Sequence, residues 1–139
     1  MHVIGVIAEY NPFHKGHLYQ INKIKEKYPN SLLVVVTSSS FTQRGNISLL
    51  NKWDKTKIAL ENNVDLVVEL PFVYSTQSSD LFAEGAISIL NTLKIDTLVF
   101  GTERDNISDL ELLADIQINN IEYQDKVKEY LSQGLNYAT

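Results

Sequence analysis

The stretch A-E-Y-N-P-F-H-K-G-H-L, from Ala8 to Leu18, decides how this chain folds. An apolar run from Val3 to Ile7 comes before it and predicts a buried strand. After it, from Leu18 to Tyr28, apolar residues recur at helical spacing. The stretch therefore predicts a strand-to-helix turn, which Asn11 and Pro12 favour because the residue before a proline avoids the α-helical region.

Two histidines and a glycine lie where the predicted helix begins. His14 and His17 are three positions apart, so in a helical turn their imidazoles face the same side. The free N–H groups and the dipole of a helix N-terminus favour an anion, and imidazoles add donors that titrate near neutral pH. Gly16 lets backbone or ligand approach closely. Together these features predict a phosphate site.

Two other interpretations of the histidine pair are surface histidines without a role and a metal site. The sequence has three histidines and no cysteine, and the third histidine is His2 at the terminus. A zinc site made of histidine and cysteine is therefore disfavoured, and we predict no protein-held metal. The position of the pair directly after a predicted strand favours the phosphate site over two unrelated surface residues.

Length and composition indicate an ordinary globular domain. The 139 residues suffice for one domain with a core, and the hydrophobic fraction is 44%. No apolar run approaches the roughly 20 residues that span a bilayer. The first residues lack a signal-peptide pattern and cysteine is absent, so we expect a cytoplasmic protein. The net charge of −5 argues against a broad nucleic-acid surface on this segment.

Strands and helices alternate along the rest of the chain. Further strands are predicted over Leu32–Thr37, Asp65–Leu70 and Thr97–Phe100. Helices are predicted over Lys52–Asn62, Asp80–Leu93, Ile107–Ile116 and Tyr123–Leu131, with a C-terminal cap at Gln133-Gly134-Leu135. Loops are predicted over Ser38–Ser48 and Phe72–Ser79. This alternation predicts an α/β fold, a Rossmann-like parallel sheet with helices on both faces.

H-x-G-H after a first strand is the signature of the nucleotidyltransferase and class I aminoacyl-tRNA synthetase superfamily. Within it, the chain resembles the bacterial tRNA(Met) cytidine acetate ligase family over nearly its whole length. The resemblance is carried by the segments G-V-I-A-E-Y-N-P-F-H-K-G-H (5–17), F-T-Q-R-G (41–45), K-W-D-K (52–55), D-L-V-V-E-L-P (65–71), Y-S-T-Q-S-S-D-L-F-A-E-G-A (74–86) and F-G-T-E (100–103). Two departures lie in the second loop, at Ser39-Ser40 and at Asn46.

The resemblance implies the strand order 3-2-1-4 and an ATP site at the edge where strands one and four end. It implies that His14 and His17 are catalytic, stabilising the α-phosphate and the departing pyrophosphate. The residues that it implies for ATP binding are Ile7, Ala8, Glu9, Tyr10, Asn11, Pro12, Phe13, His14, Lys15, Gly16, His17, Leu18, Tyr19, Gln20 and Gly101.

Four of these residues have alternative interpretations. Lys15 is either a phosphate contact or a solvated surface lysine, and the residues do not decide between them. Tyr10 and Phe13 either pack the turn or line the adenine, and packing is favoured for Phe13. Glu9 is a weak candidate for contact with water or Mg²⁺, since a single carboxylate is weak evidence for a metal.

The remaining candidates lie in the second and third loops. Arg44 beside Gly45 is predicted to contact phosphate or substrate, because it falls on the ligand edge of the sheet. A flexible surface loop is the alternative. Trp53 is predicted to lie in the core, and Ser78 or Ser79 to cap the following helix.

The function implied by the resemblance is ATP-dependent activation of acetate to acetyl-adenylate, with acetylation of N4 of the wobble cytidine of elongator tRNA(Met). Mg²⁺ is expected to accompany ATP. The alternatives are another adenylyl- or cytidylyltransferase acting on a small phosphorylated substrate, and a non-catalytic nucleotide-binding domain. Family members are much longer and carry a later arginine phosphate motif. Residues 1–139 are therefore expected to form a single ATP-binding domain, an N-terminal fragment that is inactive when isolated.

Overall fold

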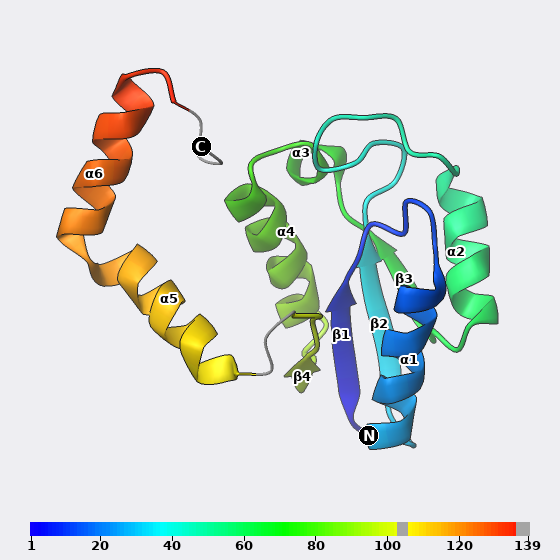
Figure 1. Ribbon diagram of the computed structural model, residues 1–139. Helices are drawn as coiled ribbons and strands as arrows, with labels where there is room; N and C mark the ends of the chain where they lie inside the picture. Colours follow the sequence, from blue (N-terminus) through cyan, green and yellow to red (C-terminus); the bar gives the residue numbers. More distant parts are fainter. Residues whose placement is uncertain (103–105, 136–139) are drawn as a thin grey trace. The chain divides into compact units, whose positions relative to one another are not determined.

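A parallel sheet of four strands forms the centre of the first part of the chain (Figure 1). The computed structural model describes residues 1–102 and 106–135. The strands are β1 (Val3–Ile7), β2 (Leu32–Thr37), β3 (Leu66–Glu69) and β4 (Thr97–Leu98). Their order is β3-β2-β1-β4 with parallel pairing throughout. The predicted Rossmann-like fold and strand order are confirmed.

Each predicted helix is present near its predicted position, and the structure has one further short helix. They are α1 (Lys15–Lys27), α2 (Lys52–Glu61), α3 (Phe72–Ser75), α4 (Ser79–Thr92), α5 (Ile107–Asn119) and α6 (Ile121–Ser132). The short helix α3 lies in the segment that was predicted to be a loop. Helix α1 begins at Lys15 with His14 as its N-cap, so the histidine pair lies at the start of the helix as predicted.

Each face of the sheet is covered by different helices, because side chains of successive strand residues point to opposite faces. One cluster joins β1 and β2 to α1 and α2, and its members are Ile4, Val6, Tyr10, Ile21, Ile24, Leu33, Val35, Ala59 and Val64. The other joins β2 to α4, and its members are Val34, Val36, Leu70, Ala86 and Leu90. Figure 1 shows α4 on the side of the sheet opposite to α1 and α2.

The strand ends set where a ligand can bind. β1 pairs with β2 from Val3 to Ile7, so both strands end at the same edge and their following loops meet there. β4 is shorter than the predicted Thr97–Phe100. It pairs with β1 only at Thr97 and Leu98, and Val99 adds one backbone hydrogen bond to the carbonyl of Gly5 before the chain leaves the sheet.

The chain forms two compact units, Met1–Gly101 and Thr102–Thr139. In the second unit, α5 and α6 contact each other. Helix α6 ends as predicted: Gly134 has φ +84°, and the N–H groups of Gly134 and Leu135 donate back to Leu131 and Tyr130. The assignment of residues 1–139 to one ATP-binding domain stays a prediction. Among the described residues, no helix is long and apolar enough to cross a bilayer.

Candidate active site

We call the turn after β1 the histidine turn (residues 8–17). The buried side chain of Tyr10 packs against two other residues of this turn. Tyr10 is 1% exposed, and burial raises the pKa of its phenol to about 12. Its φ of 48° lies in the left-handed region, which costs an L-residue about 1–2 kcal/mol. The ring contacts Phe13 and His17 edge-on, with centroids 5.0 and 4.9 Å away. Packing of this ring therefore fixes a backbone conformation that would otherwise be unfavourable.

The two histidines form the N-terminal cap of α1. The Gly16 N–H donates to Nδ1 of His14 over 3.1 Å, and the His14 N–H donates to Nδ1 of His17 over 3.2 Å. This reciprocal capping satisfies two N–H groups that a helix start leaves without partners. The rings stack with centroids 3.7 Å apart, which confirms that both imidazoles face the same side.

The capping bonds determine which ring nitrogen of each histidine carries a proton. A backbone N–H can only donate, so both Nδ1 atoms act as acceptors through their lone pairs. In the neutral rings the proton is therefore on Nε2. The two Nε2–H groups are the donors that remain for an anion at this helix N-terminus.

His17 is biased toward its neutral form. Burial lowers the pKa of the half-buried His17 below its ordinary value, and the neighbouring His14 lowers it further. A neutral His17 keeps Nδ1 free to accept the His14 N–H. At neutral pH the site thus offers a neutral hydrogen-bond donor whose orientation is set by the backbone.

Gly16 allows the His14 ring to lie against the helix. A Cβ placed on Gly16 would lie 2.9 Å from Cε1 and 3.0 Å from Nδ1 of His14. The close approach predicted for Gly16 is thus made by this ring. Lys15 is exposed at the first position of the helix, and its role as a phosphate contact stays a prediction.

The other predicted ATP contacts differ in how much surface they offer. Pro12 and Tyr19 are exposed, and Tyr10 is buried. The half-buried members of the set are Ile7, Ala8, Glu9, Asn11, Phe13, His17, Leu18 and Gln20. Their contact with ATP stays a prediction.

Glu9 binds protein groups in this structure. Its Oε1 accepts the Gln43 N–H over 2.6 Å and the Ser38 hydroxyl over 3.3 Å. Asn11 makes a second link, since its Oδ1 accepts the Leu49 N–H over 2.7 Å. The histidine turn and the loop after β2 are therefore joined at two places.

Within the described residues, no group of three or more acidic, histidine or cysteine side chains could hold a metal.

Arg44 lies at the tip of a small hairpin, which we call the Arg44 hairpin (residues 41–47). Phe41 and Ile47 form an antiparallel bridge, and the Gly45 N–H donates to the Thr42 carbonyl over 2.9 Å. Gly45 has φ +78°, a conformation that favours glycine in such a turn. Arg44 is exposed. The geometry thus presents its guanidinium to solvent, and its contact with phosphate or substrate stays a prediction.

Gly101 follows β4 at the same edge of the sheet as the histidine turn. It is exposed, and a Cβ placed on it would meet nothing within 4 Å. A side chain at this position would therefore meet no neighbour, and contact between Gly101 and ATP stays a prediction. Glu103, the last residue of the F-G-T-E segment, lies outside the described residues.

Two predictions about the neighbouring loops need correction. Trp53 was predicted to lie in the core, but it is 73% exposed, with the Lys52 ammonium 5.3 Å from its ring centre. The buried positions of α2 are Lys55 and Ala59, one helical turn apart, and Trp53 falls outside this stripe. Ser78 does occupy the N-cap of α4, but its hydroxyl makes no capping hydrogen bond.

The sequence interpretation missed Lys55. Its side chain is 1% exposed, and its ammonium donates to the backbone carbonyls of Ser38 and Glu9. The helical spacing from Lys55 to Ala59 was the available signal, but a lysine on a helix normally indicates an exposed face.

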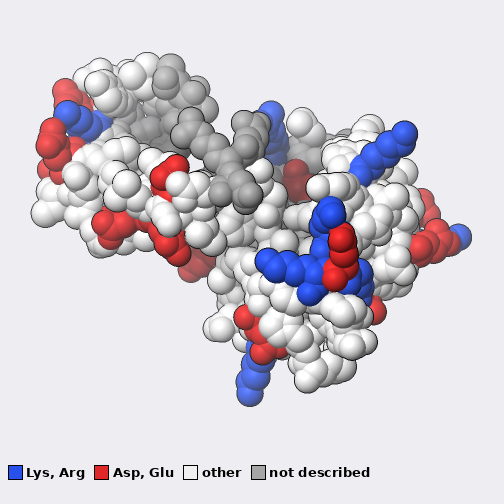
Figure 2. Space-filling model, turned by 60° about the horizontal axis from the view of Figure 1, so that its bottom comes forward, with Lys and Arg blue, Asp and Glu red and all other residues white. Residues whose placement is uncertain are grey.

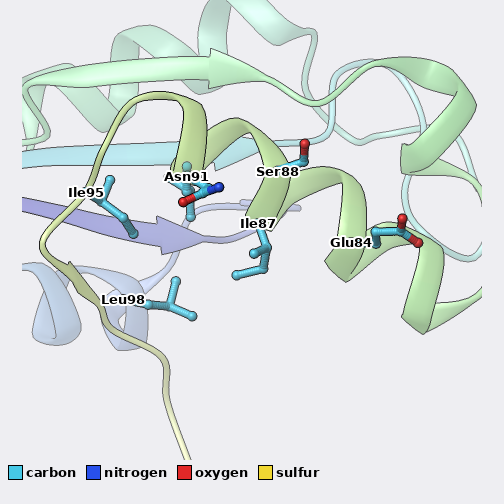
Figure 3. Close-up of a pocket in the computed structure, with 7 residues that line it drawn as sticks. Glu84, Ile87, Ser88, Asn91, Ile95 and Leu98 are labelled. Atoms are coloured by element: carbon cyan, nitrogen blue, oxygen red, sulfur yellow. The ribbon is translucent and has the colours of Figure 1, made fainter.

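A separate hollow of about 530 Å³ lies between α4 and β4. Figure 3 shows Ile87, Ile95 and Leu98 lining it, with Glu84 farther along the helix. It contains none of the predicted site residues. Its lining is mainly apolar, which does not suit a triphosphate.

Three comparisons bear on this site. A family model described as HIGH nucleotidyl transferase matches residues 1–139. A tRNA(Met) cytidine acetate ligase of Fusobacterium nucleatum subsp. nucleatum is 42% identical over 137 residues, which are 99% of this chain and 34% of the relative. The ligase of that name from Mycoplasma mobile is 47% identical over 135 residues, which are 96% of this chain and 45% of the relative.

A solved structure is similar over the same extent. The crystal structure of Thermotoga maritima TmcAL bound with alpha-thio ATP superposes with a TM-score of 0.85 at 38% identity. The match covers 99% of this chain and 34% of that chain. The chain thus spans about a third of the length of the first relatives that it matches.

Proposed function

This chain belongs to the HIGH nucleotidyl transferase family, and on that premise we propose that it is the ATP-binding part of a tRNA(Met) cytidine acetate ligase. The complete enzyme would activate acetate with ATP and transfer the acetyl group to N4 of the wobble cytidine of elongator tRNA(Met). One observation carries the proposal: two stacked imidazoles cap a helix at the carboxyl edge of the sheet, each with its Nε2–H left for an anion.

The geometry suits adenylate formation. An acetate oxygen would attack the α-phosphorus of ATP, the bond to the bridging oxygen would break, and pyrophosphate would leave with the electron pair. Negative charge shifts toward the leaving group in this step, and fixed donors stabilise it without reorganising. The Nε2–H groups of His14 and His17 would supply those donors, and no protein nucleophile is required.

The nucleoside would lie toward β4. Ligands of open parallel sheets bind outside the carboxyl ends of the strands, where the strand order reverses. That point lies between β1 and β4 in the order β3-β2-β1-β4. Gly101 leaves space there for a base or ribose, and Arg44, on the loop after β2, would contact phosphate or substrate from the other side.

Mg²⁺ would be carried by the triphosphate. It usually keeps several waters and binds substrate phosphates with one or two carboxylates. The described residues offer no cluster of ligands, and the Glu9 carboxylate already accepts two hydrogen bonds. These residues therefore fit a nucleotide-borne ion better than a protein-held one.

Recognition of tRNA would need residues beyond this chain. The net charge is −5, and on the face shown in Figure 2 the basic side chains form one small group with an acidic side chain among them, and no extended basic area. Contacts to the phosphate backbone of a nucleic acid depend on extended areas of lysine and arginine. We therefore propose that the isolated chain binds ATP weakly and does not acetylate tRNA, and that the complete enzyme acts in the cytoplasm.

The test is acetate-dependent exchange of pyrophosphate into ATP by the complete protein that carries this chain. Exchange is expected in the wild type, and His17→Ala should lower its turnover on the order of 10²-fold while ATP binding changes little. Exchange without acetate would favour another nucleotidyltransferase, and no exchange would favour a non-catalytic domain.

A control separates the chain from the complete protein. Acetylcytidine in tRNA(Met) is measured after incubation with ATP and acetate. The complete protein should form it and the 139-residue chain should not. Equal rates would contradict the proposed division of roles.

A further inference from the structure

Lys55 of α2 is a buried cation beneath the histidine turn. Its ammonium donates to the Ser38 carbonyl over 2.6 Å and to the Glu9 carbonyl over 3.2 Å. Both carbonyls lie just beyond the sheet: Glu9 is the second residue after β1, and Ser38 is the first residue after β2. One side chain thus bonds the two loops where they leave the sheet.

The hydrogen bonds of Lys55 join the two segments just beyond the place where backbone pairing between β1 and β2 ends. The last backbone bond between the neighbouring segments runs from the Ala8 N–H to the Val36 carbonyl. One residue further on, the Glu9 carbonyl accepts from two side chains, the Lys55 ammonium at 3.2 Å and the Thr37 hydroxyl at 3.3 Å. The ammonium therefore sets the separation of the two backbones as the histidine turn begins.

The Glu9 side chain extends this connection to the Arg44 hairpin. Its carboxylate accepts the Gln43 N–H, and Gln43 is the residue before Arg44. The Gln43 side chain then donates to the Gln77 carbonyl over 2.6 Å, in the segment before α4. A continuous set of hydrogen bonds thus runs from Lys55 through Glu9 and Gln43 to the loop after α3.

The charge on Lys55 strengthens these bonds. Burial lowers the pKa of its ammonium, and the carboxylates of Glu9 and Glu69 act in the opposite direction. Hydrogen bonds from a cation are roughly twice as strong as neutral ones. A buried cation with two carbonyl partners holds them more firmly than a hydroxyl would.

We propose that Lys55 is a positioning residue, which sets the placement of the histidine turn relative to the Arg44 hairpin. This inference rests on the proposed function. The two segments would contact the same phosphates from different loops, so their spacing decides whether the Nε2–H donors meet the transition state. A misplacement of about 1 Å can lower turnover about 10²-fold.

The experiment compares two substitutions on one helix in the complete protein. Lys55→Met removes the buried ammonium and keeps a long side chain. Lys57→Met is the matched control, because Lys57 is exposed and its ion pair within the described part of the chain is a surface contact with Glu61, at 3.9 Å. Acetate-dependent pyrophosphate exchange gives kcat and the KM for ATP, and thermal melts report folding.

A change in kcat without a matching change in the KM for ATP, in a variant that folds, indicates positioning and not loss of folded protein. Lys55→Met should lower kcat at least tenfold with the KM for ATP changed less than threefold, and Lys57→Met should leave both within twofold. If Lys55→Met does not fold, Lys55→Arg carries the same expectation, because its larger head group displaces both carbonyls. A folded Lys55 variant with wild-type kcat would overturn the inference.

A second readout does not depend on catalysis. In ¹H–¹⁵N spectra of the 139-residue chain, Lys55→Met should shift the Gln43 amide and the His17 ring signals, and Lys57→Met should not. Unchanged signals in Lys55→Met would overturn the inference even if the wild type shows no exchange. Absence of exchange in the wild type, with shifted signals, would contradict the proposed function alone.

Discussion

The histidine turn and the end of β4 lie at the same edge of the sheet but are built differently. The turn follows a strand paired on both sides, rests on a tyrosine that is 1% exposed, and has both histidines bonded to the backbone. β4 is an edge strand of two residues, and the Gly101 that follows has open space around it. One half of the proposed nucleotide site is therefore held by packing and hydrogen bonds, whereas an added Cβ on Gly101 in the other half would meet nothing within 4 Å.

This difference separates two tasks of a nucleotide site. Donors that stabilise a transition state must be fixed beforehand, because reorganisation during the reaction would cost the stabilisation they provide. A surface that receives a base needs room more than rigidity. The hydrogen bonds around the proposed phosphate donors, and the absence of neighbours around an added Cβ on Gly101, are consistent with these two requirements.

The largest effect should come from removing the support under the histidine turn. Tyr10→Ala should lower the free energy of unfolding by about 3–5 kcal/mol, because it removes a buried ring and leaves a cavity. Phe100→Ala, just after β4, should cost about 1 kcal/mol or less, since Phe100 is 53% exposed. Urea unfolding of the chain measures both. Equal losses would show that the two regions are equally supported.

A smaller effect should separate the two glycines. Gly16→Ala should displace the His14 ring and lower the turnover of pyrophosphate exchange by the complete protein about tenfold, roughly 1.4 kcal/mol. ATP binding and stability should change little, because the donors act in the transition state and alanine, the better helix former, offsets the weakened cap. Gly101→Ala should leave the structure of the ATP-free protein unchanged, since no atom lies within 4 Å of the Cβ that it adds. Pyrophosphate exchange, titration with ATP and the histidine ring signals of the free chain measure these effects. Displaced histidine signals in Gly101→Ala would contradict the comparison.

The smallest effect should be a pH dependence specific to the histidine turn. The folded pKa of His17 is lowered, first by burial and then by His14, relative to an unfolded value of about 6.5. The unfolded state therefore binds more protons in this window, and stability should fall as pH drops from 6.5 through the folded pKa. Urea midpoints between pH 5 and 8 measure it. His17→Gln should flatten the profile, and a stability that rises on acidification would refute the assignment.

Local pattern was enough to predict the α/β fold class, whereas the strand order came from the family resemblance. The run Leu32–Thr37 has no polar residue before its last position, which is typical of a strand covered on both faces, and it forms β2, one of the two inner strands. The histidine pair was recognised because a helix start next to a strand has its own chemistry. Both predictions depend on residues adjacent in sequence.

The missed features depend on contacts between distant segments. Lys55 is buried because two carbonyls from separate loops converge on it, and no local pattern encodes that convergence. Glu9 was considered for Mg²⁺, but its carboxylate accepts from Gln43, 34 positions away. Trp53 was assigned by residue type alone, whereas its place on the α2 wheel relative to Ala59 would have indicated the exposed side.

The capping bonds of His14 and His17 should also weaken the binding of zinc or copper ions at this site. An imidazole coordinates a metal through a ring lone pair. Here each Nδ1 lone pair accepts a backbone N–H, and each Nε2 carries a proton in the neutral ring. Coordination would require a proton to move within the ring and would break the start of α1. A pair of adjacent histidines can therefore serve a phosphate without also scavenging transition metals.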